Sequence, residues 1–274
     1  MSGAIEILHE PSATEPFAVI SKPAGLASAP LRSLDEESAF SQCARLFPAV
    51  LSVRGKKSVE GGLLHRIDTA TSGLLLAAAS QEFYDHIIAA QEAGRFVKGY
   101  RALCQIDSDN AKKLGGFPPA PRLPQSPKGW QGQNAAAIVG LELSSRFRPF
   151  GKGGAQVRPV VSGSNAAALK KAGSNKLYST KIVAADFLQG GQDKGAADSG
   201  LSKPFVRVEC QIAQGFRHQV RAHLAWFGLP IAGDALYNAD FAAGQKNGEP
   251  MRFEAVSLEF PGLDSDKVFR FSLN

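Results

Sequence analysis

The stretch from Leu63 to Ala77 places one carboxylate, Asp68, between two apolar runs. Residues 73–79, which follow it, are apolar at every position, as is typical of a strand buried on both faces. Rigid buried strands on both sides would fix Asp68 at the rim of a sheet, beside the cation of Arg66. In an ordinary loop Asp68 would only satisfy the backbone of its own turn. The apolar flanks favour a chemical role instead.

A second group of polar side chains lies in residues 214–230, which turn from a strand end into a helix. Val220, Leu224 and Phe227 form the apolar face of that helix, and Gly228 is a typical stop. His218 and Arg221 are three residues apart, so they project to one neighbouring side of the helix.

A metal site in this helix is not expected. His218 and His223 are five residues apart, which separates them by about 140° at 3.6 residues per turn. Two zinc ligands on one helix are normally four apart, and no cysteine lies close enough to complete a set. We expect neither a metal nor a cofactor.

A tyrosine and a lysine share one face of a third segment. Residues 95–104 alternate as a strand does, so Lys98 and Tyr100, two positions apart, point the same way. A tyrosine on a strand most often fills the core or the rim of a sheet.

These segments resemble the RluA-type pseudouridine synthases. Residues 65–74 match the signature H-R-L-D-x-x-T-S-G-L at every specified position except Ile67, which replaces leucine. Residues 22–26 resemble the segment K-P-x-G-L, and residues 228–237 resemble the turn G-x-P-I-x-G-D-x-x-Y. Residues 215–224 resemble G-R-T-H-Q-I-R-V-H-L, with Phe216 and Arg217 in place of the usual Arg-Thr pair.

The resemblance implies an enzyme that isomerises uridines in RNA, rRNA or tRNA, to pseudouridine. It implies that Asp68 is the catalytic carboxylate, that Arg221 forms an ion pair with it, and that Tyr100 lies beside the target base. An aromatic ring can stack on an extruded base with a gain of about 1–3 kcal/mol. The remaining residues expected to bind substrate are Arg66, His65, Lys98, His218 and Arg217.

The chemistry itself requires an ionised carboxylate and no cofactor, because the reaction gains no atoms and changes no oxidation state. A pocket that encloses a base would favour the neutral form of Asp68, and a cation such as Arg221 would oppose that effect. Attack on the sugar, addition to the base and a glycal route remain open. Two alternatives also remain: a non-catalytic RNA-binding domain on the same fold, and a glycosidase, which normally needs two facing carboxyl groups.

The composition is that of a globular protein, and its charge is compatible either with a polyanionic partner or with a solvated, flexible insert. The chain of 274 residues has a net charge of +6, and residues 105–200 hold 13 Lys/Arg against 6 Asp/Glu. No apolar run approaches the length of a membrane span, and no secretory signal is evident. Three widely spaced cysteines favour reduced thiols in the cytoplasm. We expect a cytoplasmic monomer that binds RNA and no membrane.

The predicted fold class is α+β, with a mixed, mostly antiparallel central sheet flanked by helices and an active-site cleft across the sheet. We expect a single catalytic domain over residues 1–274 with long loop insertions at about 105–200. An N-terminal S4-like domain is not expected, because the strand that ends at Lys22 begins almost at once. The predicted helices and strands are 35–47 and 81–93, and 17–22, 95–104, 135–143, 157–161, 177–183, 205–212, 251–260 and 268–273.

Overall fold

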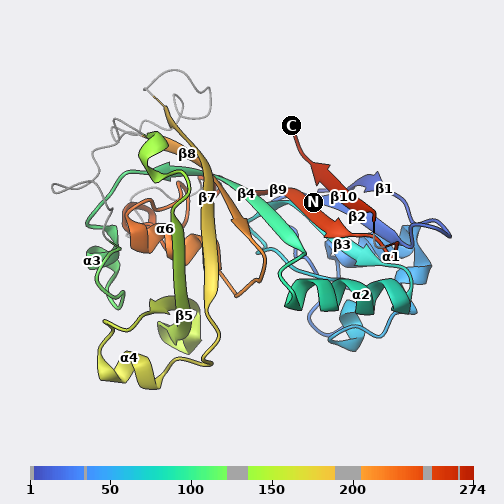
Figure 1. The fold of residues 1–274 in the computed structure, drawn as a ribbon, viewed down its shortest axis with the longest axis horizontal. Helices are drawn as coiled ribbons and strands as arrows, with labels where there is room; N and C mark the ends of the chain where they lie inside the picture. Colours follow the sequence, from blue (N-terminus) through green and yellow to red (C-terminus); the bar gives the residue numbers. More distant parts are fainter. Residues whose placement is uncertain (1–2, 34–35, 122–134, 189–204, 243–248, 265) are drawn as a thin grey trace. The chain divides into compact units, whose positions relative to one another are not determined.

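The computed structural model describes residues 3–33, 36–121, 135–188, 205–242, 249–264 and 266–274. The chain divides into two compact units (Figure 1). Unit 1 comprises Met1–Tyr100 and Glu254–Asn274, and unit 2 comprises Arg101–Phe253. Strands β4 (Val97–Gln105) and β9 (Phe253–Pro261) are divided between the units, so each unit holds a part of both strands.

Unit 1 is built on a sheet in which antiparallel pairing predominates. β2 and β3 pair antiparallel from Phe17↔Ala78 to Lys22↔Gly73, whereas β3 and β9 run parallel at Ser72↔Glu254. In sheet order the strands are β1 (Glu6–His9), β2 (Phe17–Lys22), β3 (Ser72–Ala78), β9 and β4, and β10 (Val268–Ser272) pairs with β9.

The core of unit 1 lies between this sheet and helix α2 (Gln81–Glu92). The ring of Phe17 stacks on Phe83 of α2 at 4.8 Å and meets Phe260 edge-on at 5.3 Å. α2 begins where Ser80 Oγ accepts a hydrogen bond from the N–H of Phe83 at 3.2 Å, a standard N-cap. The other helical segments of unit 1 are α1 (Ala39–Leu46), η1 (Pro48–Leu51) and η2 (Ser58–Glu60).

Unit 2 carries the second half of β4 and an antiparallel sheet. In sheet order its strands are β4, β8 (Phe205–Ile212), β7 (Tyr178–Leu188), β5 (Glu142–Phe150) and β6 (Gln156–Val160). Its helical segments are α3 (Asn110–Leu114), η3 (Ala135–Ile138), η4 (Lys152–Gly154), α4 (Ala166–Lys170), α6 (Gln219–Phe227) and α7 (Ala239–Ala242).

Helix α6 packs on one face of the unit 2 sheet. The ring of Phe147 on β5 stacks on Phe216 at 5.0 Å, and Ala222 and Ala225 are buried in the same cluster. The helix ends at Gly228, whose φ of 92° is left-handed and whose Cα would place a side chain against the backbone of Ser108. Glycine is therefore required at this stop, as the sequence predicts.

The predicted α+β class with a largely antiparallel sheet is confirmed. The expected strand before Asp68 is wrong: residues 64–71 are irregular, although Leu63 forms a bridge with Ala77 and the N–H of Leu64 bonds to Leu76 O at 3.0 Å. Residues 135–138 form a 3-10 turn instead of the start of a strand. In the expected loop region, residues 122–134 and 189–204 lie outside the described residues. No helix among the described residues is long and apolar enough to cross a membrane.

Candidate active site

The loop that carries Asp68 is fixed on its N-terminal side by one serine. Ser28 Oγ donates to Ile67 O at 2.6 Å and accepts from Ile67 N at 3.1 Å, so a single hydroxyl satisfies both backbone groups of Ile67. Ser28 and Ile67 are both buried. Because buried hydrogen bonds are costly to leave unmade, this contact holds the residue before Asp68 in one place.

The same loop is fixed on its C-terminal side by a second contact to the segment that follows β2. The carbonyl of Thr69 accepts from Gly25 N at 2.7 Å and from Lys22 Nζ at 3.3 Å. Within the loop, Thr71 N donates to Asp68 O at 3.0 Å and closes a turn. Hydrogen bonds to backbone groups therefore hold the residues on both sides of Asp68.

Lys22 is a buried cation close enough to Asp68 for the carboxylate to act on its pKa. The side chain is fully buried, and Nζ donates to Leu26 O at 2.7 Å and Pro23 O at 2.9 Å. Burial lowers the pKa of Lys22 to about 8, and the negative charge of Asp68 acts in the opposite direction. From the sequence, Lys22 is expected to belong to a turn that supports the floor of the active site, without a chemical role of its own. The signal available was its place in the segment K-P-x-G-L.

Tyr100 lies close enough to Asp68 for the charge of the carboxylate to affect the pKa of the phenol. The ring is buried, with 7 % of the residue exposed. Burial raises the pKa of the Tyr100 phenol well above its ordinary value, and the negative charge of Asp68 raises it further. The phenol is therefore neutral at physiological pH and can donate a hydrogen bond. The structure thus brings together two of the three residues predicted to be catalytic, both in unit 1.

Lys98, two positions before Tyr100, is buried against an aromatic ring. Its ammonium lies 4.1 Å from the centre of the Phe96 ring and donates to Phe96 O at 3.3 Å. Burial lowers the pKa of Lys98 to about 7. A lysine with this pKa exists in both protonation states near neutral pH.

His65 is held in the core of unit 1 as a neutral ring. Its Nε2 accepts from the N–H of Leu76 on β3 at 3.3 Å, and Phe96 meets the ring edge-on at 5.3 Å. Burial lowers the pKa of His65 to about 3, and the charge of Lys98 acts in the same direction. Because Nε2 is an acceptor, the ring proton lies on Nδ1. His65 therefore fastens the start of the Asp68 segment to β3.

Arg66, next in the chain, is exposed and ion-paired. Its Nη1 lies 2.8 Å from Oε1 of the buried Glu60, which Lys57 also approaches at 3.6 Å. The guanidinium thus keeps donors directed toward solvent at the edge of the loop.

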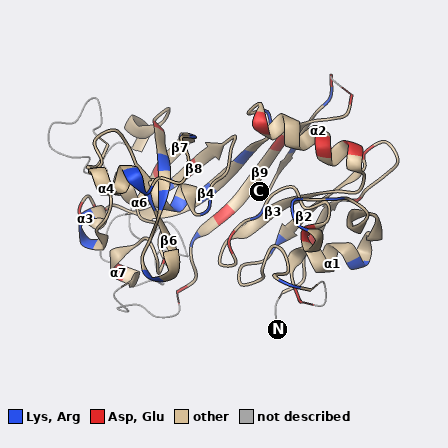
Figure 2. Ribbon diagram, turned by 90° about the horizontal axis from the view of Figure 1, so that it is seen from below, with Lys and Arg blue, Asp and Glu red and all other residues tan. Residues whose placement is uncertain are grey.

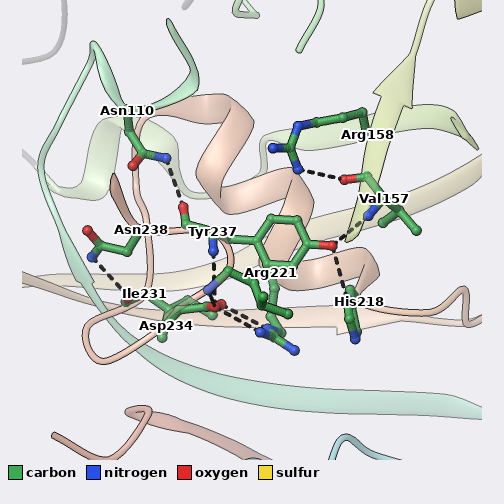
Figure 3. Close-up of polar contacts among 10 residues, drawn as sticks. Asn110, Val157, Arg158, His218, Arg221, Ile231, Asp234, Tyr237 and Asn238 are labelled. Carbon is green, nitrogen blue, oxygen red and sulfur yellow. Dashed lines mark hydrogen bonds and ion pairs between the residues drawn. The ribbon is translucent and has the colours of Figure 1, made fainter. Parts of the chain in front are cut away.

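In unit 2, Arg221 forms a bidentate ion pair with Asp234 (Figure 3). Nε and Nη2 of the arginine lie 2.8 Å from Oδ2 and Oδ1 of the aspartate, and both residues are buried. Asp234 Oδ1 also accepts from the N–H groups of Leu236 and Tyr237 at 2.9 and 3.1 Å. Two parallel bonds of this kind fix the plane of the guanidinium. Asp234 is not among the residues predicted from the sequence, although its place in the turn G-D-x-x-Y is a signal for it.

Tyr237 links Arg221 to the other predicted residues of unit 2. The guanidinium of Arg221 lies 5.1 Å from the centre of its ring. Its hydroxyl accepts from Val157 N at 2.8 Å and lies 3.0 Å from His218 Nδ1, as Figure 3 shows. His218 has a φ of 57°, a left-handed conformation uncommon outside glycine, and it precedes the first residue of α6.

Arg217 is exposed and reaches the loop before β6. Its Nη2 donates to the carbonyls of Gly154 and, at 3.3 Å, Gln156. Of the predicted residues of unit 2, His218 and Arg221 thus both contact Tyr237, whereas Arg217 bonds to the backbone around the start of β6. The predicted ion pair between Asp68 and Arg221 joins the two units and stays a prediction.

Among the described residues, no group of three His, Cys, Asp or Glu is placed to hold a metal ion.

Comparisons with known proteins point to one family. The family model described as RNA pseudouridylate synthase matches residues 16–226. A Mycoplasma pneumoniae protein named uncharacterized RNA pseudouridine synthase MG209 homolog is 23% identical over 278 residues, which cover 98% of this chain and 67% of that protein.

Two solved structures share the fold. Human RNA pseudouridylate synthase domain containing 1 is similar with a TM-score of 0.61 and 17% identity, over 98% of this chain and 83% of that one. Human RNA pseudouridylate synthase domain containing 4 is similar with a TM-score of 0.55 and 17% identity, over 98% and 87% of the two chains.

Proposed function

Since the chain belongs to the RNA pseudouridylate synthase family, we propose that Asp68 is the carboxylate with which it isomerises specific uridines of rRNA or tRNA. The observation that carries this proposal is the clamp around Asp68. The Ser28 hydroxyl bonds to the backbone of Ile67, and the Lys22 ammonium and the Gly25 N–H bond to the carbonyl of Thr69, which leaves the acid on a rigid turn with Tyr100 nearby. Catalytic groups need this kind of fixed support.

The reaction breaks the C1′–N1 bond, turns the uracil and joins C5 to C1′. N1 gains a proton and C5 loses one, so atoms and electrons balance without an external reactant. Asp68 acts in its ionised form, as the nucleophile or as the base. The choice between attack on the sugar, addition to the base and a glycal route stays open.

Tyr100 is proposed to contact the target base. The base must leave its stack at a cost of a few kcal/mol, and stacking on an aromatic ring returns part of that energy. The neutral phenol, whose pKa burial raises, can also hold a proton or a water without adding a second negative charge beside Asp68.

Arg221 is proposed to be the cation that pairs with Asp68 and keeps it charged. A guanidinium has five N–H donors, and the bonds to Asp234 use two of them. In this proposal Asp234 is a positioning residue, because it acts only through Arg221.

The other predicted residues are proposed to bind RNA directly or to support those that do. Arg66 and Arg217 are exposed and would contact phosphates. His65, Lys98 and His218 are proposed to support the shape of the RNA-binding site. Each is partly or fully buried and bonded within its own unit. We also propose that the protein is a cytoplasmic monomer, which its three buried free cysteines support.

An experiment with RNA tritiated at uracil C5 tests the proposed function. A pseudouridine synthase releases the tritium to water as C5 forms its new bond, and the uracil stays attached to the RNA. A non-catalytic RNA-binding domain releases nothing, and a glycosidase releases free uracil. Either of the last two results, obtained with rRNA and tRNA transcripts at enzyme excess, would refute the proposal.

A further inference from the structure

In one continuous segment of unit 2, all charged side chains are basic. Between residues 143 and 185 the chain has eight Lys/Arg and no Asp/Glu, although the whole protein has a net charge of only +6. The segment comprises most of β5, all of β6, α4 and the first part of β7. Figure 2 shows blue positions near α4 and α6 of unit 2, whereas red positions gather on α2 of unit 1.

The arginines of this segment share one face of the β5–β6 hairpin. Along β5 the residues Leu143 and Phe147 are buried, and Arg146 and Arg148 point to the opposite face. Arg148 lies directly opposite Arg158 of β6 in the register. Two like charges at opposed positions destabilise a sheet, so this arrangement has a cost that a bound anion would remove.

Arg158 is a buried cation without an acidic partner in the described part of the chain. Only 1% of it is exposed. Its guanidinium donates to Gly115 O at 2.9 Å and Val157 O at 3.1 Å, and lies 4.2 and 4.1 Å from the ring centres of Phe117 and Phe150. Burial lowers the pKa of Arg158 to about 10, so the group is still charged at neutral pH.

The two arginines of β5 likewise contact only neutral groups among the described residues. Arg148 Nη2 donates to Gly116 O at 2.7 Å, while its Nε is buried and finds no acceptor there. Arg146 Nη1 lies 3.3 Å from Oδ1 of Asn175. Exposed cations of unit 1 differ in this respect, since Arg45, Lys267 and Arg270 pair with Glu37, Glu15 and Glu259.

The tip of the β5–β6 hairpin carries an exposed cation, and the glycines beside it have free space around them. Lys152 is exposed, and it lies between Gly151 and Gly153, whose φ values are 77° and 61°. Nothing lies within 4 Å of a side chain built at either glycine. A glycine-lined tip lets another backbone approach closely.

We propose that the arginine face, defined as Arg146 and Arg148 with Lys152 at the tip, docks the sugar-phosphate backbone of the substrate RNA. The buried Arg158 adds positive charge beside Arg148 without contacting the RNA. The face offers charge without acidic groups, which matches the sequence-independent phosphate contacts that position a protein on a nucleic acid. This inference rests on the proposed function, because it assumes that RNA is the substrate.

The test compares two triple variants of equal net charge. One is Arg146→Gln/Arg148→Gln/Lys152→Gln, and the control is Arg45→Gln/Lys267→Gln/Arg270→Gln, whose three cations are already paired with glutamates. The dissociation constant for a fluorescein-labelled RNA stem–loop is measured over a range of salt concentrations. The slope of log affinity against log salt should fall by about 2 in the first variant and stay close to the wild-type slope in the control.

The outcomes separate this inference from the proposed function. The proposed docking surface is refuted if the first variant and the wild type have equal slopes. It is also refuted if the wild type does not bind the stem–loop. A larger loss of binding to anionic lipid vesicles than to RNA overturns it too. A wild type that releases no tritium from C5-labelled RNA refutes only the function. If the triple variant unfolds, Lys152→Gln, at an exposed position of the arginine face, should still lower the slope by about 1.

Discussion

Arg221 and Asp234 form a buried bidentate ion pair, with Nε–Oδ2 and Nη2–Oδ1 distances of 2.8 Å each. A buried arginine that loses its carboxylate is left uncompensated, which typically costs about 3–5 kcal/mol. In this protein the pair has a second consequence, because it fixes the plane of the guanidinium that we propose for Asp68. The aspartate of the pair is therefore expected to affect catalysis as well as stability.

Substitution Asp234→Asn should lower kcat by about 10- to 100-fold, the cost of misplacing a catalytic group by about an ångström. KM for RNA should change much less, since Asp234 does not contact RNA in the proposal. The measurement is tritium release under saturating RNA, at a temperature where the variant is folded. The control is Glu209→Gln, which breaks the half-exposed ion pair with Arg101 in the same unit and should leave kcat near wild type. A variant that loses stability but keeps its kcat would show that the pair is only structural.

Substitution Ser28→Ala removes both hydrogen bonds to Ile67 and should destabilise the protein by about 1–3 kcal/mol. It should also lower kcat, because the loop that carries Asp68 is released on one side. The comparison is Ser80→Ala, which removes the N-cap of α2 and should cost about 1 kcal/mol without altering kcat. Urea unfolding and tritium release, measured on both variants, test this. An equal kcat in the two variants would contradict the role of the clamp.

Substitutions of Tyr100 separate its ring from its hydroxyl. Tyr100→Phe keeps the stacking surface, so RNA affinity should stay near wild type while kcat reports the contribution of the phenol. Tyr100→Leu removes the ring and should weaken binding of uridine-containing RNA by about 1–3 kcal/mol. Binding of an RNA whose target position is abasic should be unaffected in both. Identical losses for both RNAs would place Tyr100 outside the base-binding site.

His223 makes stability depend on pH. The ring is fully buried between Ser145 Oγ and Thr180 Oγ1, each at 2.9 Å, and burial lowers the pKa of His223 to about 3. The unfolded chain takes up a proton below about pH 6.5 and the folded chain does not, so the free energy of unfolding falls as pH decreases toward 3. Because His65 also has a pKa of about 3, it contributes in the same direction.

The measurement is urea unfolding at pH 7 and pH 5 for the wild type and His223→Gln. The variant should be less stable at pH 7, and its loss between the two pH values should be smaller than that of the wild type. Equal losses would show that His223 does not remain neutral in the folded protein.

The contiguous patterns of the chain predicted much of the fold. The alternation of residues 205–212 predicted β8 with the bounds that the structure has. Ser80 correctly predicted the start of α2, and Gly228 correctly predicted the end of α6. Asp68 stood out because its motif is continuous in sequence. Residues 64–71 were mispredicted in part because an apolar segment can pair irregularly with β3 and be buried without forming a strand.

The supporting residues of the site were not predictable in the same way. Ser28, Lys22 and Asp234 are separated from their partners by 39, 47 and 13 residues. Their roles depend on tertiary contacts, which no local periodicity encodes. A serine, a lysine and an aspartate are each common in exposed turns, so residue type alone predicts solvent contact for all three. Their burial and their tertiary contacts distinguish them from exposed turn residues.

The most direct test of the account is tritium release from C5-labelled RNA by Asp68→Asn, with RNA affinity measured on the same preparation. Asp85→Asn, an exposed aspartate on α2, serves as the control for loss of a carboxylate in unit 1. We predict that Asp68→Asn binds RNA within a few-fold of wild type and releases no tritium, whereas Asp85→Asn is fully active. Turnover by Asp68→Asn at a rate near wild type would contradict the account.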